Sequence, residues 1–379
     1  MYKQNNIEAS WNKFKSIFFA VIDKHIPKIK ISNNSQPPWF DSEIFNLCRK
    51  KEWFRARSKG SSSPEHYAKF SESRREFKKL AEQKMRENIL TDDNASDLIT
   101  KKFWSHVKSK TKSTRIPETV HLGDTYRSGT EEKAELFNVF FYNQFSKPSK
   151  YDISVNFDLG ESFNIDFSLS KVENLLSDIN SSKAMGPDGI HGKMLKNCSK
   201  GLAGPLSKLF QICYYNCKLP SDWKSAHVVP VHKKGSKTDV ENYRPISLTS
   251  LVVKTLERII RDEIMLRCHN HIDQRQHGFL LGKSCGTQLL GFCDSLALSL
   301  NQNIRTDVIY FDFAKAFDSV SHDIILNKLK YQFNIDGYLL GFVSNYLKDR
   351  SQSVVLGNDR SSCKPVTSGV PQGSILGLI

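Results

Sequence analysis

The chain has 379 residues, and its 55 lysines and arginines against 40 aspartates and glutamates give a formal net charge of +15 at pH 7. A hydrophobic fraction of 39%, with 11% aromatic residues, is enough for a packed core and excludes wholesale disorder. No apolar run approaches the ~18 residues of a membrane span, and the stretch 17–22 lacks the cleavage site of a secretory signal. The positive excess makes nucleic acid the first partner to test.

The eight cysteines contain no Cys-x-x-Cys pair. In a chain of this size, that usage is typical of reduced thiols that mostly fill a core. We therefore expect an intracellular protein that is not secreted and has no membrane partner.

The first third of the chain is predicted to be helical. Apolar residues recur at helical spacing from Trp11 to Ile22, and Pro37-Pro38 stops any helix there. Asp41 is a plausible N-cap of a second helix, and a long charged helix is expected over residues 65–89.

Residues 41–112 are strongly basic, with 18 lysines and arginines against 11 aspartates and glutamates. One interpretation is a solvated helical face. The other is an arm that follows a nucleic-acid backbone, which the interleaved Trp53, Phe54, Phe103 and Trp104 favour. The candidate nucleic-acid-binding residues are Lys50, Lys51, Arg55, Arg57, Arg74, Arg75, Lys78 and Lys79.

A polar, irregular connection over residues 146–167 follows a helix expected at 131–145, and it is the best candidate domain boundary. We therefore expect a basic helical linker region over residues 1–160 and a second domain over residues 161–379.

The sequence pattern changes from residue 168. From there on, short predicted helices alternate with short predicted strands, and turn-forming residues become frequent. Segments 226–232 and 308–312 are predicted strands, and 352–356 with 363–366 is a predicted hairpin. Helices and strands without a regular βαβ repeat favour an α+β fold.

The segment 308–312 ends on Asp312, and a turn or helix follows. A carboxylate at the end of a buried strand is costly unless it is paired. Two roles remain open from this segment alone: a ligand of a divalent metal such as Mg²⁺, which prefers oxygen ligands, or a cap of the following helix.

Two further segments contain residue types that suit a phosphorylated ligand. Lys233-Lys234-Gly235 follows the predicted strand 226–232, and Arg244 lies nine residues beyond Gly235, so this basic hairpin could hold a triphosphate. The glycine-rich segment 368–377 surrounds Gln372 and permits close backbone approach to a ligand. Taken alone, each of these two segments is better explained as an ordinary turn.

Taken in order, six segments resemble those of a non-LTR (LINE-type, jockey-like) retrotransposon reverse transcriptase. The resemblance covers about residues 170–379 and rests on Lys183–Ile190, Val229–Gly235, Asn242–Leu248, Gln276–Phe279, Phe311–Asp318 and Gly369–Gly377. It implies the fingers and part of the palm of a right-hand polymerase, preceded by a basic helical linker.

The resemblance also implies roles for single residues. Asp312 would be the first catalytic, metal-binding carboxylate, with the Phe313 carbonyl as a further ligand of Mg²⁺ or Mn²⁺. Lys233 and Arg244 would grip the triphosphate. Phe317 would be the aromatic gate that excludes a 2′-hydroxyl, while Asp318 is expected to have a structural role at the start of the next helix. Gln372 and Gly373 would contact the nucleotide and template.

Implied partners are an RNA template, a DNA primer and deoxynucleoside triphosphates, and the implied location is the nucleus and cytoplasm. One departure matters: the family's aromatic-x-Asp-Asp motif, which carries the second set of carboxylates, is not reached before Ile379. Since two-metal catalysis needs both sets, we expect this chain alone to be inactive as a polymerase.

Two alternatives remain. An RNA-dependent RNA polymerase shares the palm architecture, but Phe317 favours deoxynucleotides. A non-catalytic nucleic-acid-binding remnant is compatible with the missing motif.

Overall fold

The computed structural model describes residues 6–27, 39–60, 64–90, 116–146, 165–313 and 315–378. The chain divides into two compact units: Ile26–Arg115, and Met1–His25 together with Ile116–Ile379. The domain boundary expected near residue 160 lies outside the described residues and stays a prediction.

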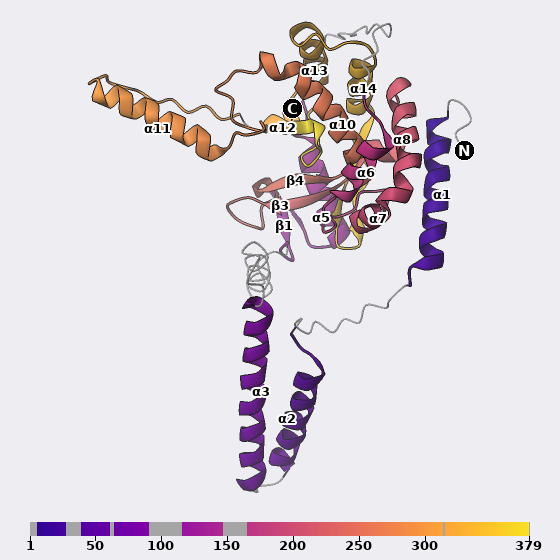
Figure 1. Ribbon diagram of the computed structural model, residues 1–379. Coiled ribbons are helices and arrows are strands. Elements are labelled where there is room, and N and C mark those ends of the chain that lie inside the picture. Colours follow the sequence, from indigo (N-terminus) through magenta and orange to yellow (C-terminus); the bar gives the residue numbers. More distant parts are fainter. Residues whose placement is uncertain are drawn as a thin grey trace. The chain divides into compact units, whose positions relative to one another are not determined.

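The smaller unit is a pair of helices, α2 (Ser42–Gly60) and α3 (Pro64–Leu90), that pack side by side (Figure 1). The N-cap is confirmed, because Asp41 Oδ1 accepts a hydrogen bond from the Ile44 N–H over 3.1 Å. Lys84 of α3 forms ion pairs with Asp41 and Glu43 at the same end. The start of α2 is therefore fixed both by its own cap and by the neighbouring helix.

A helical core holds the larger unit together. Its main helices share buried apolar faces and are α1 (Ile7–His25), α6 (Leu169–Ser177), α7 (Gly192–Asn197), α8 (Ser199–Tyr215), α10 (Leu251–Cys268) and α14 (Gly337–Leu347). The helix expected around residues 11–22 is confirmed as α1. Its Trp11 is fully buried, with its ring centroid 5.1 Å from that of Trp223 in α9 (Ser221–Lys224).

A mixed sheet forms beside this helical core. β3 (Ser225–His232) pairs antiparallel with β4 (Tyr243–Leu248) and parallel with β5 (Arg350–Leu356). The short strands β6 (Asp359–Arg360) and β7 (Lys364–Val366) pair antiparallel with β5, which confirms the hairpin predicted there. α5 (Thr130–Tyr142) packs on the sheet, with the Phe137 ring centroid 4.9 Å from that of Tyr243. The mixed α+β fold class is therefore confirmed at this level.

The remaining elements are short or peripheral. They are the strands β1 (Val120–Leu122) and β2 (Thr125–Arg127), the helices α11 (Cys285–Asn301), α12 (Ala316–Ser319) and α13 (His322–Asn327), the 3₁₀ turns η1 (Val240–Asn242), η2 (His269–His271) and η4 (Leu376–Leu378), and a π-helical turn, η3 (Lys328–Gln332). Among the described residues, no helix combines the length and the apolar character needed to cross a membrane.

The strand predicted over residues 308–312 is wrong. Residues 304–313 form neither helix nor strand, and Tyr310 and Phe311 are 81% and 87% exposed. A strand requires a neighbour that pairs with its N–H and C=O groups. None of the described strands lies beside this segment. The apolar pattern was therefore present without the pairing that would turn it into a buried strand.

Candidate functional site

β3 and β4 form the hairpin that carries Lys233 and Arg244. Val231 lies opposite Arg244, and the Lys233 N–H donates to the Asn242 carbonyl over 2.8 Å. The turn requires Gly235, since its φ is +75° and a Cβ there would lie 2.8 Å from the Asn242 side chain. Lys233 and Arg244 are both exposed, and neither is ion-paired with another described residue. Such neighbouring cations on one rigid hairpin can bind a polyphosphate.

The segment with Gln372 is attached to the same hairpin through β4. The Ser247 N–H donates to the Gln372 carbonyl over 2.8 Å. Gly373 has φ +118°, and a Cβ there would lie 2.8 Å from the Ser247 carbonyl oxygen. The structure therefore brings Gln372 and Gly373 to the strand that carries Arg244, and it gives Gly373 a packing reason to be glycine.

Gly369 allows the same segment to approach the turn around residues 317–320. Its N–H donates to the Val320 carbonyl over 2.7 Å, and the next N–H, that of Val370, donates to the Phe317 carbonyl over 2.8 Å. A Cβ on Gly369 would lie 2.3 Å from that same carbonyl oxygen. The close approach that glycine permits is thus made to the chain's own backbone.

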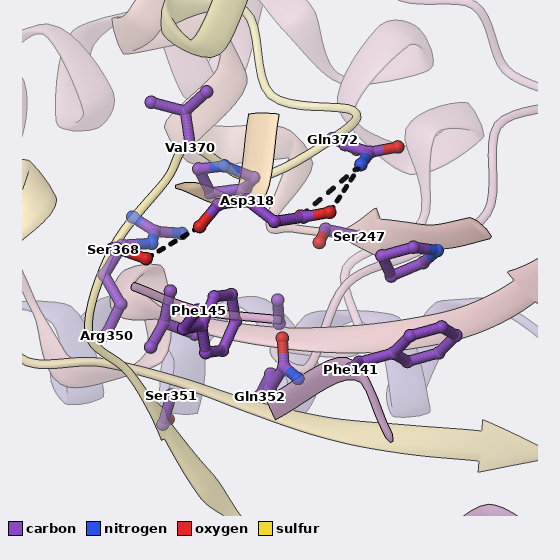
Figure 2. A pocket seen from close by; sticks show the side chains of 14 residues that line it. Phe141, Phe145, Ser247, Asp318, Arg350, Ser351, Gln352, Ser368, Val370 and Gln372 are labelled. Carbon is purple, nitrogen blue, oxygen red and sulfur yellow. Dashed lines mark hydrogen bonds between the residues drawn. The ribbon is translucent and has the colours of Figure 1, made fainter. Parts of the chain in front are cut away.

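A small pocket lies between these segments, α5 and the sheet (Figure 2). It is lined by Phe141, Phe145, Ala226, Pro245, Ser247, Asp318, Arg350, Ser351, Gln352, Val366, Ser368, Val370, Pro371 and Gln372. Its volume is about 20 Å³, which is room for about one water molecule. This pocket is therefore too small to admit a nucleotide.

Asp318 points into this pocket (Figure 2). Its two carboxylate oxygens accept hydrogen bonds from Gln372 Nε2 over 3.3 and 3.4 Å. Burial raises the pKa of Asp318, and the Gln372 bond and the charge of Lys315 oppose that rise. Asp318 lies in the first turn of α12, and its carboxylate also bonds the Gln372 side chain, so the structural role expected for it stays a prediction.

Phe317 points into a different cavity. That cavity is apolar, has a volume of about 450 Å³ and is also lined by Phe279, Val320, Tyr346 and Val370. The Phe317 and Phe279 rings form an edge-to-face pair with centroids 6.4 Å apart. The structure therefore does not place the Phe317 side chain with Gln372, and its role as a sugar gate stays a prediction.

Asp312 and Phe313 lie in the exposed segment 304–313, where the Phe313 side chain is 84% exposed. Among the described residues, no group of three or more His, Cys, Asp or Glu side chains could hold a metal ion. A pair of Mg²⁺ ions needs several oxygen ligands from more than one segment. The residues present here therefore do not fit a two-metal site by themselves.

Two buried carboxylates were given no individual role in the sequence interpretation, although Asp188 lies in the segment Lys183–Ile190 named there. Asp188 is buried, its Oδ2 accepts from Ser250 Oγ over 2.6 Å, and a Cβ on nearby Gly186 would lie 2.5 Å from the Ser250 nitrogen. Glu257 is fully buried in α10 and accepts the Ile375 N–H over 2.6 Å. The available signal for Glu257 was its helical spacing from the apolar Val253 and Ile260.

The basic residues of the smaller unit fall into two groups. Most of them have a partner: Lys50 pairs with Glu76, Arg55 with Glu52 and Lys78 with Glu82, Lys51 lies 4.5 Å from the Phe77 ring centroid, and Arg57 lies 4.0 Å from that of Trp53. Arg74, Arg75 and Lys79 of α3 are not ion-paired with any other described residue.

A groove of about 840 Å³ lies between α2, α3 and Trp39-Phe40, and Phe70, Phe77, Lys51, Arg55, Arg74 and Lys78 are among its lining residues. Aromatic rings next to cations can stack bases and hold phosphates. Phe103 and Trp104 lie outside the described residues.

Comparison with known proteins assigns the part of the chain that carries this site to a protein family. Residues 231–379 match the family described as "Reverse transcriptase (RNA-dependent DNA polymerase)". The C-terminal part of the chain is therefore a reverse transcriptase domain, in a family that acts on nucleic acids and generally uses a divalent metal.

The curated relatives narrow the kind of reverse transcriptase. The RNA-directed DNA polymerase from mobile element jockey of Drosophila melanogaster is 33% identical over 55% of this chain and 23% of its own length. The protein of that name from Drosophila funebris is 24% identical over 98% of this chain and 42% of its own length. A probable RNA-directed DNA polymerase from transposon BS of Drosophila melanogaster is 32% identical over 42% of this chain and 18% of its own length.

The domain is thus of the non-LTR, jockey-like retrotransposon type, as the order of its motifs predicted. The chain spans between 18% and 42% of the length of these relatives.

Proposed function

We propose that this chain is the nucleotide-gripping part of an RNA-directed DNA polymerase of a non-LTR retrotransposon. Residues 161–379 would form the fingers and part of the palm of a right-hand polymerase, and residues 1–160 the basic linker. The supporting observation is the bond between Ser247 N–H and the Gln372 carbonyl. It joins β4, which carries Arg244, to the segment of Gln372. Two segments that are predicted to contact the nucleotide are therefore held side by side.

The intact parent would extend a DNA primer on an RNA template with deoxynucleoside triphosphates. Bound Mg²⁺, or Mn²⁺, neutralises phosphate charge and activates the attacking hydroxyl in such reactions. Asp312 and the Phe313 carbonyl would supply this chain's ligands to such an ion, and carboxylates from another segment would have to complete the site. Because the described residues supply no acidic cluster there, we propose that the chain alone does not polymerise.

Triphosphate binding by the full chain tests the proposal. Lys233→Ala and Arg244→Ala should each weaken the binding of dATP roughly 10- to 150-fold, because a charge-assisted hydrogen bond contributes roughly 1.5–3 kcal/mol. Lys200→Ala, which removes another exposed lysine, should not. Absence of binding by the unchanged chain, or equal binding by all variants, would contradict the proposed function.

A second candidate is a nucleic-acid-binding protein without catalysis, which the groove between α2 and α3 favours. Arg74 in the groove, and Arg75 and Lys79 elsewhere on α3, would contact phosphates, and the aromatic lining of the groove would stack bases. The RNA-dependent RNA polymerase is less favoured, because an aromatic side chain at Phe317 offers a 2′-hydroxyl no hydrogen bond.

A further inference from the structure

We infer that Lys183, Lys254 and Arg258 form a second phosphate-binding site, which holds the backbone of a bound nucleic-acid strand beside α10. This inference rests on the proposed function, because it adds a contact for a nucleic-acid strand to the nucleotide site of the β3–β4 hairpin. Lys183 begins the segment Lys183–Ile190, whose role the family resemblance leaves open.

The turn that follows Lys183 is held against the beginning of α10. Asp188 Oδ2 accepts a hydrogen bond from Ser250 Oγ over 2.6 Å, and Ser250 is the N-cap of α10. A Cβ on Gly186 would lie 2.5 Å from the Ser250 nitrogen, so the two backbones touch. Lys183, three residues before Gly186, is therefore held near the first turns of α10.

α10 itself presents two cations to this side. Lys254 and Arg258 are both half-buried and lie four residues apart, which places them on the same face of the helix. Neither of them, nor Lys183, is ion-paired with another described residue. Glu257 is fully buried, and its carboxylate bonds the Ile375 N–H instead. Three cations thus lie together without an acid that pairs with them.

The field at Lys254 shows that this arrangement is costly without a ligand. Burial lowers the pKa of Lys254; the charge of Glu257 opposes that change, and the charge of Lys183 adds to it. The two lysines are therefore close enough for their charges to repel each other. A bound phosphate favours the charged form of both side chains and offsets this repulsion.

The position of the site favours a polymeric ligand. β4 leads from Arg244 to Leu248, and the rise along this part of the strand is about 13 Å. α10 begins only at Leu251, beyond the end of β4. A triphosphate held at Arg244 does not also reach Lys254, whereas a strand with one phosphate per nucleotide can contact both.

A triple variant of the full chain tests the site with single-stranded oligoadenylate RNA as the probe. Lys183→Gln, Lys254→Met and Arg258→Gln together should reduce the slope of log K against log salt by roughly 2, at ~0.7 per phosphate contact. Methionine keeps the apolar stem of Lys254 packed. The matched control removes the same charge from exposed lysines of α7 and α8 and should change the slope little: Lys193→Gln, Lys196→Gln and Lys208→Gln. Equal reductions in the two triple variants overturn the inference.

The second readout is the pKa of Lys254 in the unchanged chain with ¹³C-methylated lysines, the resonance being assigned by its loss in Lys254→Met. Oligoadenylate should raise this pKa, because a nearby phosphate favours the ammonium form. Oligoadenylate with uncharged methylphosphonate linkages should not. An unchanged pKa with the natural RNA, or no RNA binding by the unchanged chain, overturns the inference. Failure to bind dATP contradicts the proposed function instead, and the RNA titration still decides whether this site exists.

Discussion

Glu257 shows how one buried side chain supports the segment that follows Gln372. Its carboxylate accepts the N–H groups of Ile375 and Leu376 over 2.6 and 3.3 Å and the Tyr346 hydroxyl over 3.2 Å. Burial raises the pKa of Glu257, and Arg350 and the two N–H groups oppose that rise. The cost of burying this acid is thus offset by donors from the segment that it anchors.

Removing this carboxylate should destabilise the fold. We expect Glu257→Ala to lower the free energy of unfolding by about 2–4 kcal/mol, because it leaves two partly buried N–H groups and the buried Tyr346 hydroxyl without an acceptor. Glu257→Gln keeps one acceptor oxygen and should cost less. The control is Glu263→Ala on the same helix, which removes an ion pair with Arg267 and should cost under about 1 kcal/mol. Urea denaturation measures the free energy of unfolding of all three variants. Equal losses in the two alanine variants would contradict the anchoring role of Glu257.

His322 makes stability depend on pH. Its Nε2–H donates to the Gly369 carbonyl over 2.8 Å. Burial lowers the pKa of His322 from the ordinary 6.5, with Arg350 and Lys348 adding to that effect, while the Gly369 bond and Asp323 oppose it. The folded state thus binds this proton less readily than the unfolded state. The contribution of neutral His322 to stability is therefore fully present above pH 6.5. It falls as the pH drops towards the lowered pKa of the folded state.

Urea midpoints at pH 7.5 and pH 5 test this dependence. We expect His322→Gln, which can still donate to the Gly369 carbonyl, to lose less stability between the two pH values than the unchanged chain. His25→Gln alters an exposed histidine of α1 and should behave like the unchanged chain. The idea fails if His322→Gln shows the same acid sensitivity as the unchanged chain.

Single residues also show what the sequence could not reveal. Phe317 and Asp318 are adjacent, and the sequence interpretation assigned the ligand-facing role to the aromatic ring. The one-turn helix α12 begins after Lys315, whose φ is +54°, and it directs the two side chains into different cavities. A local backbone reversal of this kind leaves no periodicity from which the direction of a side chain could be predicted.

At the scale of elements, the sequence predicted what depends on local contacts. The helices α1, α3 and α5, the Asp41 cap and the strand β3 are confirmed within a few residues. The strand predicted at 308–312 was wrong because a strand depends on a partner that may be distant in sequence. The position of β4 beside Gln372 was likewise not predictable from spacing, since a single long-range bond creates it.

The helix pair α2–α3 provides a test at this scale. The triple change Arg74→Gln, Arg75→Gln and Lys79→Gln in the full chain should weaken binding of single-stranded RNA. It should also reduce the slope of log K against log salt by roughly 2, at ~0.7 per phosphate contact. Lys69→Gln removes a lysine already paired with Glu65 and should change little. Binding that is unaffected by the triple change would favour the solvated-face interpretation.

For the whole molecule, the order of six short segments identified the family although no single segment was specific. The match over residues 231–379 and the jockey relatives confirm that assignment. The predicted residues assemble only in part. Arg244 lies in β4, Lys233 follows its partner strand β3, and the segment of Gln372 and Gly373 is bonded to β4 at Ser247. Asp312 lies in an exposed segment and Phe317 in an apolar cavity. Binding of a triphosphate is thus better supported by this chain than catalysis is.

Primer extension tests directly whether this chain alone can polymerise. The assay contains the full 379-residue chain, an RNA template with its primer, Mg²⁺ or Mn²⁺ and all four deoxynucleoside triphosphates. We predict no templated incorporation, because the described residues place Asp312 in no cluster that could hold two metal ions. Templated incorporation that disappears in Asp312→Ala would contradict it.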